Sequence, residues 1–425
     1  MDFLTKVKIF EPILQHREPL RSTDRLMQII FEERGFIDSL WLRFYRRKKV
    51  MPAKIAAIFY IASSEILFFE RNIHALTIKQ ALDAVRGCPW SFWAKPLQAF
   101  WAMLITRREE FLNERKLNSD QFIELSFDPW LVQRWKDRYG LEQTRVLIEY
   151  FQKTPSLHLV VNLALISTEQ YCQALETRGI RFESPFPALP IVVIDEKVTV
   201  RSLPGYADGW FWVQDTPAFL LTKLIAPGFY ERILDVCAVP GGKSMALSLF
   251  IRGNIWVLND RYYKKFPRLR ENLGRLKNSL SQLTISDGRV SCFKNSFSLV
   301  LLDAPCSALG IIQKIGDLRR GKTPEMMCEL IELQCALLEE AGRIVAPDGF
   351  LLYSTCTLEP EENEQQIGGF LQRHPDFHVV FPDLTLNPWL KPFITPQGYF
   401  YSLPFIHQLS GAFAALLQRK PGESR

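Results

Sequence analysis

Alternation between short apolar runs and helical patterns, which begins near residue 209, constrains the fold of this chain more than any other feature. The apolar runs predict strands at 232–237, 255–258, 283–286, 299–302 and 350–353, with later strands near Val379 and at 412–417. Helical patterns fall between most of these strands, and strands joined through helices pair in parallel. The sequence therefore predicts a doubly wound α/β domain over 209–425.

Two further regions precede this domain. Residues 1–126 are predicted to be all-helical, because apolar residues recur there at three- and four-residue spacing and Gly and Pro are scarce. The clearest helices in this region are expected at 24–34, 55–69 and 96–112. For residues 127–208 the sequence predicts a small α+β region. It should contain helices at 129–139, 142–152 and 168–178 and strands at 157–163, 191–194 and 197–201.

Composition narrows the class of protein. Of 425 residues 47% are hydrophobic and 23% are charged, which excludes a disordered or collagen-like chain. The formal net charge of +6 is compatible with a nucleic-acid partner and does not require one. The longest apolar run, 55–69, is too short to span a membrane, and the N-terminus lacks the pattern of a signal peptide. We therefore expect a cytoplasmic protein that does not contact a membrane. A monomer is also expected, although the sequence carries no signal of oligomeric state.

The cysteine pattern argues against a metal site and against disulfides. None of the eight cysteines forms a Cys-x-x-Cys pair, and no Cys/His cluster has the spacing of a zinc site. Cys328 and Cys335 lie seven residues apart on one face of a predicted helix, where we interpret them as packing residues. The chemistry of the remaining cysteines depends on where they stand relative to the strands.

A glycine turn follows the first predicted strand. The run from Asp235 to Ser244 ends in Gly241-Gly242-Lys243-Ser244 and leads into a helix, so the backbone can approach a ligand closely. A phosphate-binding loop would need Gly five residues before Gly242, where this chain has Cys237, so we exclude a nucleoside triphosphatase.

Acidic residues follow the next two strands. Asp260, about 20 residues past the glycines, suits the two hydroxyls of a ribose, or else caps a helix. Asp287 is suited to accept a hydrogen bond from an adenine amino group, or else it makes a turn. At each position the residues leave both interpretations open.

Cysteines follow the fourth and fifth strands. The fourth strand leads into Asp303-Ala304-Pro305-Cys306-Ser307, and the fifth into Ser354-Thr355-Cys356-Thr357. Ligands bind beyond the carboxyl ends of the strands in open α/β sheets. If the two strands are neighbours, about 4.8 Å apart, both thiols share one site. A single cysteine at a strand end is usually a packing residue, but two such cysteines favour chemistry.

These motifs resemble the RsmB-type ribosomal RNA cytosine-5 methyltransferases of the NOL/NOP/Sun group. The resemblance rests on the glycine turn and on both cysteine motifs, the second of which is followed by Pro360-Glu361-Glu362-Asn363. It covers about 127–420, while the helical region 1–126 is similar only in character to the NusB-like domain of such proteins. Where the family often has Gly after the first cysteine motif, this chain has Ala308.

The resemblance implies a Rossmann-like methyltransferase domain that uses S-adenosyl-L-methionine. It implies that Cys356 is the nucleophile, that Cys306 assists product release, and that Asp303 contacts the cytosine edge. It also carries over Lys243 as a site residue of less defined role. The implied cofactor-binding residues are Ala238, Val239, Pro240, Gly241, Gly242, Lys243, Asp260, Asp287 and Asp303.

The expected function is methylation of carbon 5 of a cytosine in RNA, with small-subunit ribosomal RNA favoured. A thiolate that adds to ring carbon 6 makes carbon 5 nucleophilic toward a methyl sulfonium. Alternatives are a transfer-RNA cytosine-5 methyltransferase and a non-catalytic RNA-binding assembly protein. A DNA enzyme ranks below them, because such enzymes use the Pro-Cys cysteine as nucleophile and lack the Thr-Cys-Thr partner.

Three clusters of basic residues are candidates for RNA contacts. The run over 261–277 after the second strand is interpreted mainly as a solvated face. The cluster Arg43–Lys49 and the residues Arg319, Arg320 and Lys322 are the better candidates for phosphate contacts.

Overall fold

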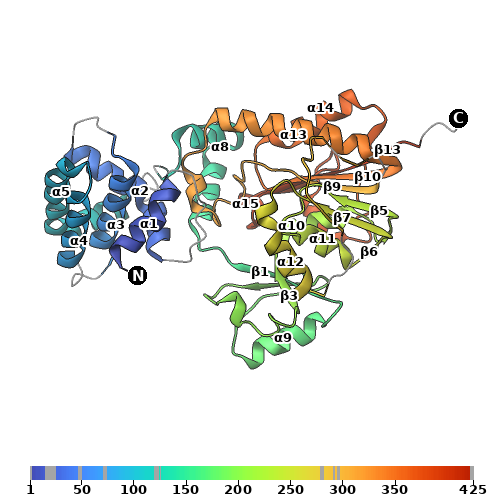
Figure 1. Cartoon of the computed structure of the whole chain (residues 1–425), viewed down its shortest axis with the longest axis horizontal. Coiled ribbons are helices and arrows are strands. Elements are labelled where there is room, and N and C mark those ends of the chain that lie inside the picture. The colour runs from blue at the N-terminus through green and yellow to red at the C-terminus, as the bar shows by residue number, and fades with distance from the viewer. Residues whose placement is uncertain are drawn as a thin grey trace. The chain divides into compact units, whose positions relative to one another are not determined.

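The computed structural model describes residues 2–14, 25–45, 50–69, 74–118, 124, 126–277, 282–290, 292–293 and 297–421. The chain forms two compact units, coloured along the sequence in Figure 1. The first comprises Met1–Lys153 with Ile312–Lys322, and the second comprises Thr154–Ile311 with Thr323–Arg425. No helix among the described residues is both long and apolar enough to cross a membrane.

The first unit is helical, as expected for its N-terminal part. Its helices are α1 (Phe3–Leu14), α2 (Arg25–Phe44), α3 (Ala53–Phe68), α4 (His74–Arg86), α5 (Ala94–Thr106), α6 (Arg108–Leu117) and α8 (Pro129–Gln152). The apolar helix α3 packs against α1, α2, α4 and α5, which explains why it is buried on nearly all sides. α8 is two helical segments joined at Gly140, whose φ of 79° suits glycine.

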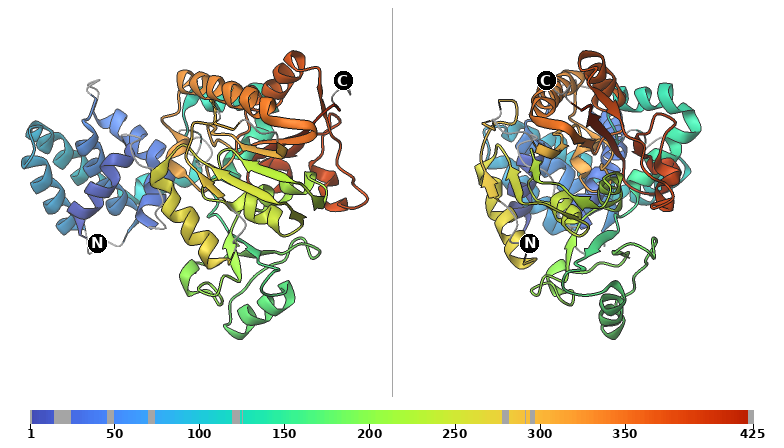
Figure 2. Two further views of the ribbon diagram at one scale, coloured as in Figure 1. Left: turned by 45° about the vertical axis from the view of Figure 1, so that its right-hand side comes forward. Right: turned by 90° about the vertical axis from the view of Figure 1, so that its right-hand side faces the viewer.

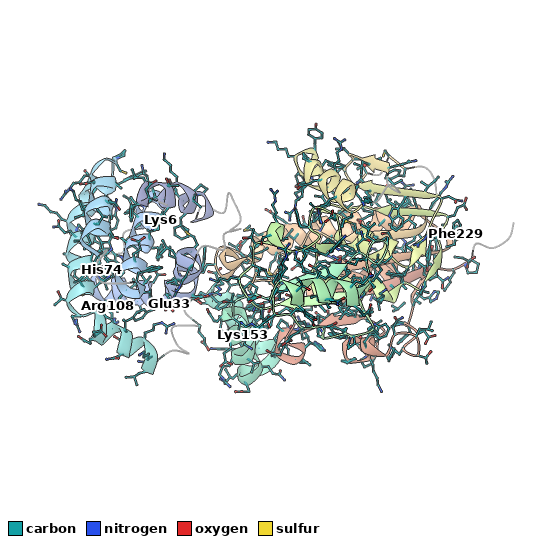
Figure 3. The ribbon with its side chains drawn as sticks, turned by 90° about the horizontal axis from the view of Figure 1, so that it is seen from below. Lys6, Glu33, His74, Arg108, Lys153 and Phe229 are labelled. Carbon is teal, nitrogen blue, oxygen red and sulfur yellow. The ribbon has the colours of Figure 1, made fainter. Side chains whose placement is uncertain are left out.

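Ion pairs connect the helices of this unit. Lys6 pairs with Glu65 at 2.5 Å, and Arg115 pairs with Glu33. Lys6 and Glu33 are labelled in Figure 3. Glu65 also accepts a hydrogen bond from Thr77 at 2.6 Å, so α3 is tied to both α1 and α4. These buried carboxylates have the hydrogen-bonded partners that burial of charge requires.

Arg319 is buried in the first unit, so the prediction that it contacts RNA phosphates is wrong, whereas for the partly exposed Arg320 it stays a prediction. Arg319 is only 4% exposed and donates to the side chain of Gln152 at 3.0 Å and to the carbonyl of Phe151 at 2.7 Å. Arg320 donates to Asp38 at 2.7 Å. Their long-range acceptors lie more than 160 residues away along the chain, which sequence spacing cannot reveal.

The other members of the two favoured clusters have different outcomes. The carbonyl of Lys322 accepts a hydrogen bond from Trp130, and no phosphate-binding role follows from this contact. Arg43 pairs with Glu114 through two hydrogen bonds of 2.9 and 3.2 Å. The basic residues 46–49 lie outside the described residues.

The second unit begins with a small antiparallel sheet, shown in green in Figure 2. Its strands β1 (Leu157–Val161), β2 (Ile191–Ile194) and β3 (Phe211–Val213) pair in the order β2-β1-β3, and α9 (Thr168–Thr177) packs on one face. The strand predicted at 197–201 is wrong. That stretch ends in a 3-10 turn, Val200–Ser202, and does not join the sheet. Both edges of β1 are paired and β2 is bridged on its outer side through Glu183, so neither strand offers it an open edge.

The large sheet contains every strand predicted for the α/β domain. Its path is β11-β13-β10-β9-β5-β7-β8, and β12 (Phe400–Ser402) pairs with β13. The strands are β5 (Arg232–Asp235), β7 (Ile255–Asn259), β8 (Gln282–Thr284), β9 (Phe297–Asp303), β10 (Val345–Thr355), β11 (Phe377–Val379) and β13 (Ala412–Arg419). The five strands from β10 to β8 on this path pair in parallel, and β13 runs antiparallel.

Helices cover both faces of this sheet, as a Rossmann-like domain requires (Figure 1). Leu299 and Leu301 of β9 face the core formed with α11 (Gly242–Ser248) and α12 (Phe266–Arg275), whereas Val300 and Leu302 face α13 (Pro324–Ile344) and α14 (Glu364–Arg373). The strand order reverses between β5 and β9, which creates a topological switch point at their carboxyl ends.

Candidate active site

The two cysteine motifs meet at the carboxyl ends of neighbouring strands. β9 and β10 pair in parallel with Asp303 opposite Ser354, so the loops that follow leave the sheet side by side. The sulfur atoms of Cys306 and Cys356 lie 3.4 Å apart, and the backbone N–H of Cys356 points to the sulfur of Cys306 at 3.3 Å. Two thiols thus share one site, which a reacting base can approach from beyond the sheet.

An ion pair stands beside the thiols. Lys243, in the first turn of α11, places its ammonium 2.6 Å from the carboxylate of Asp303, and Ser354 donates to the same carboxylate at 3.0 Å. Burial lowers the pKa of Lys243, but attraction to Asp303 and, more weakly, to Cys356 outweighs it, so the pKa lies above its ordinary value. Lys243 is therefore a fixed cation at the thiol site.

The glycine turn connects β5 to α11. Gly241 has a φ of 99°, and a Cβ there would lie 2.7 Å from a methyl of Leu269, so the turn needs glycine. Ser244 donates to Asp235 at 2.6 Å, while the other oxygen of Asp235 is buried and accepts no hydrogen bond from the described residues. Burial raises the pKa of Asp235 to about 7.

Asp260 and Asn259 brace this turn from β7. Asp260 accepts backbone N–H groups of Val239 at 3.3 Å and of Tyr262 at 2.9 Å. Asn259 donates to the carbonyls of Val236 and Ser286, so it ties the ends of three strands together. Sequence reasoning missed Asn259, although its polar side chain at a buried strand end was a usable signal.

Asp287 follows β8 and contacts two arginine side chains. Arg289 donates to its two oxygens at 3.0 and 2.7 Å, and Arg261 approaches to 3.6 Å. The hydrogen bonds from Arg289 are the main reason that the pKa of Asp287 falls to about 2. An adenine amino group bound here would have to share the carboxylate with Arg289.

A buried polar network lies behind the cysteines and was not recognised as functional from the sequence. Glu362 accepts hydrogen bonds from the backbone of Ser307 and from Gln334, both at 2.8 Å. Asn363 accepts from Thr355 at 2.5 Å and donates to the carbonyl of Thr357 at 3.2 Å. The Pro-Glu-Glu-Asn run that follows the second cysteine motif thus holds both loops.

The basic run after β7 divides into two kinds of residue. Six members are exposed, in agreement with a solvated face: Arg261, Lys264, Lys265, Arg268, Arg270 and Lys277. Arg275 is partly buried and donates to the carbonyls of Tyr206 and Phe211 at 3.0 and 2.8 Å. Arg275 therefore anchors α12 to the small sheet.

The residues at this edge suit the cofactor that the family resemblance implied. A turn that requires glycine, an unpartnered buried oxygen on Asp235 and carboxylates after three strands match a ligand with a carboxylate, an amine and a ribose. Among the described residues, no group of three or more His, Cys, Asp and Glu side chains is placed to hold a metal ion.

Known proteins resemble this chain in sequence and in fold. Residues 222–418 match the family described as 16S rRNA methyltransferase RsmB/F, and residues 127–201 match the ferredoxin-like domain of RsmF/B-like methyltransferases. A probable ribosomal RNA small subunit methyltransferase B from Synechocystis sp. is 32% identical over 73% of this chain and 70% of its own length.

Two solved structures share the fold. The crystal structure of PH0851 covers 93% of this chain and 89% of that chain, with a TM-score of 0.76 and 24% identity. NSun6 from Pyrococcus horikoshii, solved with SFG, covers 70% of this chain and 99% of that chain, with a TM-score of 0.61 and 18% identity. The fold therefore extends beyond the sequences that are readily aligned.

Proposed function

The chain belongs to the 16S rRNA methyltransferase RsmB/F family, and on this premise we propose that it methylates carbon 5 of a cytosine in small-subunit ribosomal RNA through a covalent cysteine adduct. Membership makes it an S-adenosylmethionine-dependent RNA methyltransferase. The observation that carries the adduct is the pair of thiols 3.4 Å apart beside a partly buried cation.

In this proposal Cys356 is the nucleophile. Its sulfur adds to ring carbon 6 of the cytosine and makes carbon 5 electron-rich. Lys243 supplies positive charge next to the site, which favours a thiolate and stabilises the negative charge that develops on the ring. Asp303, held by Lys243 and Ser354, is oriented to accept a hydrogen bond from the cytosine amino group.

Cys306 has the second role, in release of the product. The hydrogen bond with Cys356 and burial raise the pKa of Cys306 well above its ordinary value, so its sulfur is a strong proton acceptor once ionised. Once the Cys356 sulfur is bonded to carbon 6, it no longer hydrogen-bonds or repels Cys306 as a thiolate, so Cys306 can release its own proton to solvent. The Cys306 thiolate then takes the proton from carbon 5, and the Cys356 sulfur leaves as a thiolate to complete the turnover. Cys306 is adjacent to that sulfur, as such a role requires.

The cofactor is S-adenosylmethionine, which supplies the methyl group as a sulfonium. We propose that the backbone of Ala238, Val239, Pro240, Gly241 and Gly242 cradles its amino-acid end, with Lys243 and Asp303 beside the sulfonium. Asp260 would hold the ribose and Asp287 the adenine. Asp260 already accepts two N–H groups, so it is preorganised as an acceptor.

The target base must leave its stack to reach two thiols at the carboxyl ends of neighbouring strands. A loop or an unfolded segment of RNA satisfies this condition more readily than a duplex. The relatives of known name are bacterial small-subunit enzymes, which supports ribosomal RNA in the cytoplasm as the target. We also propose that the chain acts as a monomer, which light scattering of the purified protein would test.

The proposed domains keep the boundaries predicted from sequence: a helical NusB-like domain at 1–126, an RNA-recognition region at 127–208 and the methyltransferase domain at 209–425. The ferredoxin-like match at 127–201 supports the second of these. RNA binding by the full chain and by a variant that lacks residues 1–126 would be compared with separate RNA fragments. This comparison tests which of the proposed domains binds RNA.

The experiment that tests the function is methylation with labelled cofactor. The full chain is incubated with labelled S-adenosylmethionine and, separately, with small-subunit rRNA and with tRNA, and the labelled nucleoside is identified. We expect 5-methylcytidine in rRNA. Label in tRNA alone would favour the transfer-RNA alternative, and absence of label in either, with RNA still bound, would favour a non-catalytic assembly protein.

A further inference from the structure

The side chain of Glu362 is 0% exposed. Its carboxylate has no role in the reaction proposed above. Its Oε2 accepts hydrogen bonds from the backbone of Ser307 and from Gln334, and its Oε1 accepts one from the hydroxyl of Ser307. Three donors suit an ionised carboxylate, which is an acceptor only. A negative charge is therefore accommodated directly behind the first cysteine loop.

Glu362 connects both cysteine loops through hydroxyl groups. Ser307 follows Cys306 in the chain, and its hydroxyl lies 2.7 Å from the hydroxyl of Thr357, the residue after Cys356. The backbone carbonyl of Glu362 also accepts a hydrogen bond from Tyr353 at 2.7 Å. The carboxylate is thus connected to both cysteine loops by short, buried hydrogen bonds.

Charges of opposite sign flank the two sulfur atoms. Lys243 is attracted to Cys356, and this attraction contributes to the raised pKa of the lysine. The pKa of Cys306 is raised by its hydrogen bond with Cys356 and by burial, and repulsion from Glu362 adds to them. A cation therefore favours negative charge on Cys356, whereas an anion disfavours it on Cys306.

We propose that Glu362 is a positioning residue that keeps the proton on Cys306 and so leaves Cys356 as the nucleophile. Two thiols 3.4 Å apart cannot both ionise readily, because like charges at that distance repel strongly. A buried anion on one side then decides which of the two remains protonated. This inference rests on the proposed function, since it explains how that function assigns different roles to two similar groups.

The other ionisable groups around the site do not reverse this asymmetry. Tyr353, buried in β10 beneath the cysteines, has a pKa raised mainly by burial and stays neutral. Asp303 is paired with Lys243, and Ser354 donates to it as well. Glu362 is the carboxylate that contacts the Cys306 loop directly, through two groups of Ser307.

The test is the pH dependence of thiol alkylation in the full chain. Substoichiometric iodoacetamide is added between pH 6 and 11, and mass spectrometry of digests gives the rate at each cysteine. In the wild-type protein Cys356 should react at lower pH than Cys306, and the opposite order would overturn the proposal without any variant. In Glu362→Gln the profile of Cys306 should move to lower pH, and each unit of movement multiplies its thiolate fraction about tenfold.

Two control variants separate charge from scaffolding. Ser307→Ala removes a hydroxyl contact but keeps the carboxylate, so the Cys306 profile should move far less than in Glu362→Gln. Glu361→Gln removes the neighbouring charge of the same motif, and the profile should stay at its wild-type position. An unmoved profile in a folded Glu362→Gln, or equal movement in Ser307→Ala, would refute the proposal. Because no RNA is needed, failure here is distinct from failure of the methylation assay.

Discussion

The sulfur atoms of Cys306 and Cys356 lie 3.4 Å apart, although 50 residues separate them in the chain. This distance follows from the parallel pairing of β9 with β10, which brings the two strand ends to one edge of the sheet. One thiol can therefore add to a base while the other stays within reach of the same ring. The arrangement predicts different consequences when each cysteine is removed.

Cys356→Ala should neither methylate RNA nor form a covalent link, because addition at ring carbon 6 is lost. Cys306→Ala should still add and transfer the methyl group but fail to expel the sulfur, so a protein–RNA adduct should accumulate. A denaturing gel with target RNA and S-adenosylmethionine measures this as a slow, RNase-sensitive band that is absent in the double variant. A band with Cys356→Ala alone would mean that the two roles are exchanged.

Asp260→Ala should weaken S-adenosylmethionine binding by roughly ten- to a hundred-fold, because loss of a charged acceptor costs about 1.5–3 kcal/mol. Isothermal titration calorimetry with the full chain measures the affinity. Asp383→Ala, the same substitution at an exposed position on the surface, is the matched control. Equal affinities for the two variants would remove Asp260 from the cofactor site.

Asp235 should make stability depend on pH. Burial raises its pKa from 3.8 to about 7 in the folded chain, so the folded state binds the proton more tightly than the unfolded state. Wild-type stability should therefore fall, relative to Asp235→Asn, as pH rises from about 4 to 7. The full difference is on the order of 4 kcal/mol. Urea denaturation at several pH values measures it, and a constant difference between the two proteins would contradict the predicted shift.

Arg319→Ala should destabilise the helical unit rather than weaken electrostatic binding to RNA. It leaves the carbonyl of Phe151 and the side chain of Gln152 without a buried donor, at a cost of about 3 kcal/mol or more. Thermal unfolding should reveal this loss, while the salt dependence of RNA binding should match wild type. Arg268→Ala, on the exposed face of α12, is the contrasting variant and should leave unfolding unchanged.

Ala308→Gly should stabilise the first cysteine loop. Ala308 has a φ of 61°, in the left-handed region that favours glycine. Relief of this strain is partly offset by the greater entropy of glycine in the unfolded chain. The free energy of unfolding should therefore rise by about 0.5–1 kcal/mol. Ala346→Gly tests the same replacement in β10, where φ is not positive, and should be destabilising. Chemical denaturation compares the two, and a loss of stability in both would exclude the strain.

The family of the chain and most of its strands could be predicted without coordinates. Buried parallel strands need continuous apolar runs, so β9 and β10 were visible as such in the sequence. Gly241 was also visible, because a close approach of turn and helix tolerates no side chain there. The stretch 197–201 had an equally suitable alternation, but it leads into the 3-10 turn Val200–Ser202 and pairs with no strand of the small sheet.

The sequence by itself determined which local structures form, because strand, helix and turn preferences act over a few neighbouring residues. It also determined which groups are present to react: two cysteines, an aspartate and a lysine. Tertiary structure decided which of these groups meet. The order of strands brought Lys243 to Asp303, the docking of residues 312–322 buried Arg319, and long-range contacts with Ser307 and Gln334 placed Glu362 behind the thiols. Such contacts join residues that are 50 to more than 160 positions apart, so they depend on packing of the whole chain and leave no local pattern.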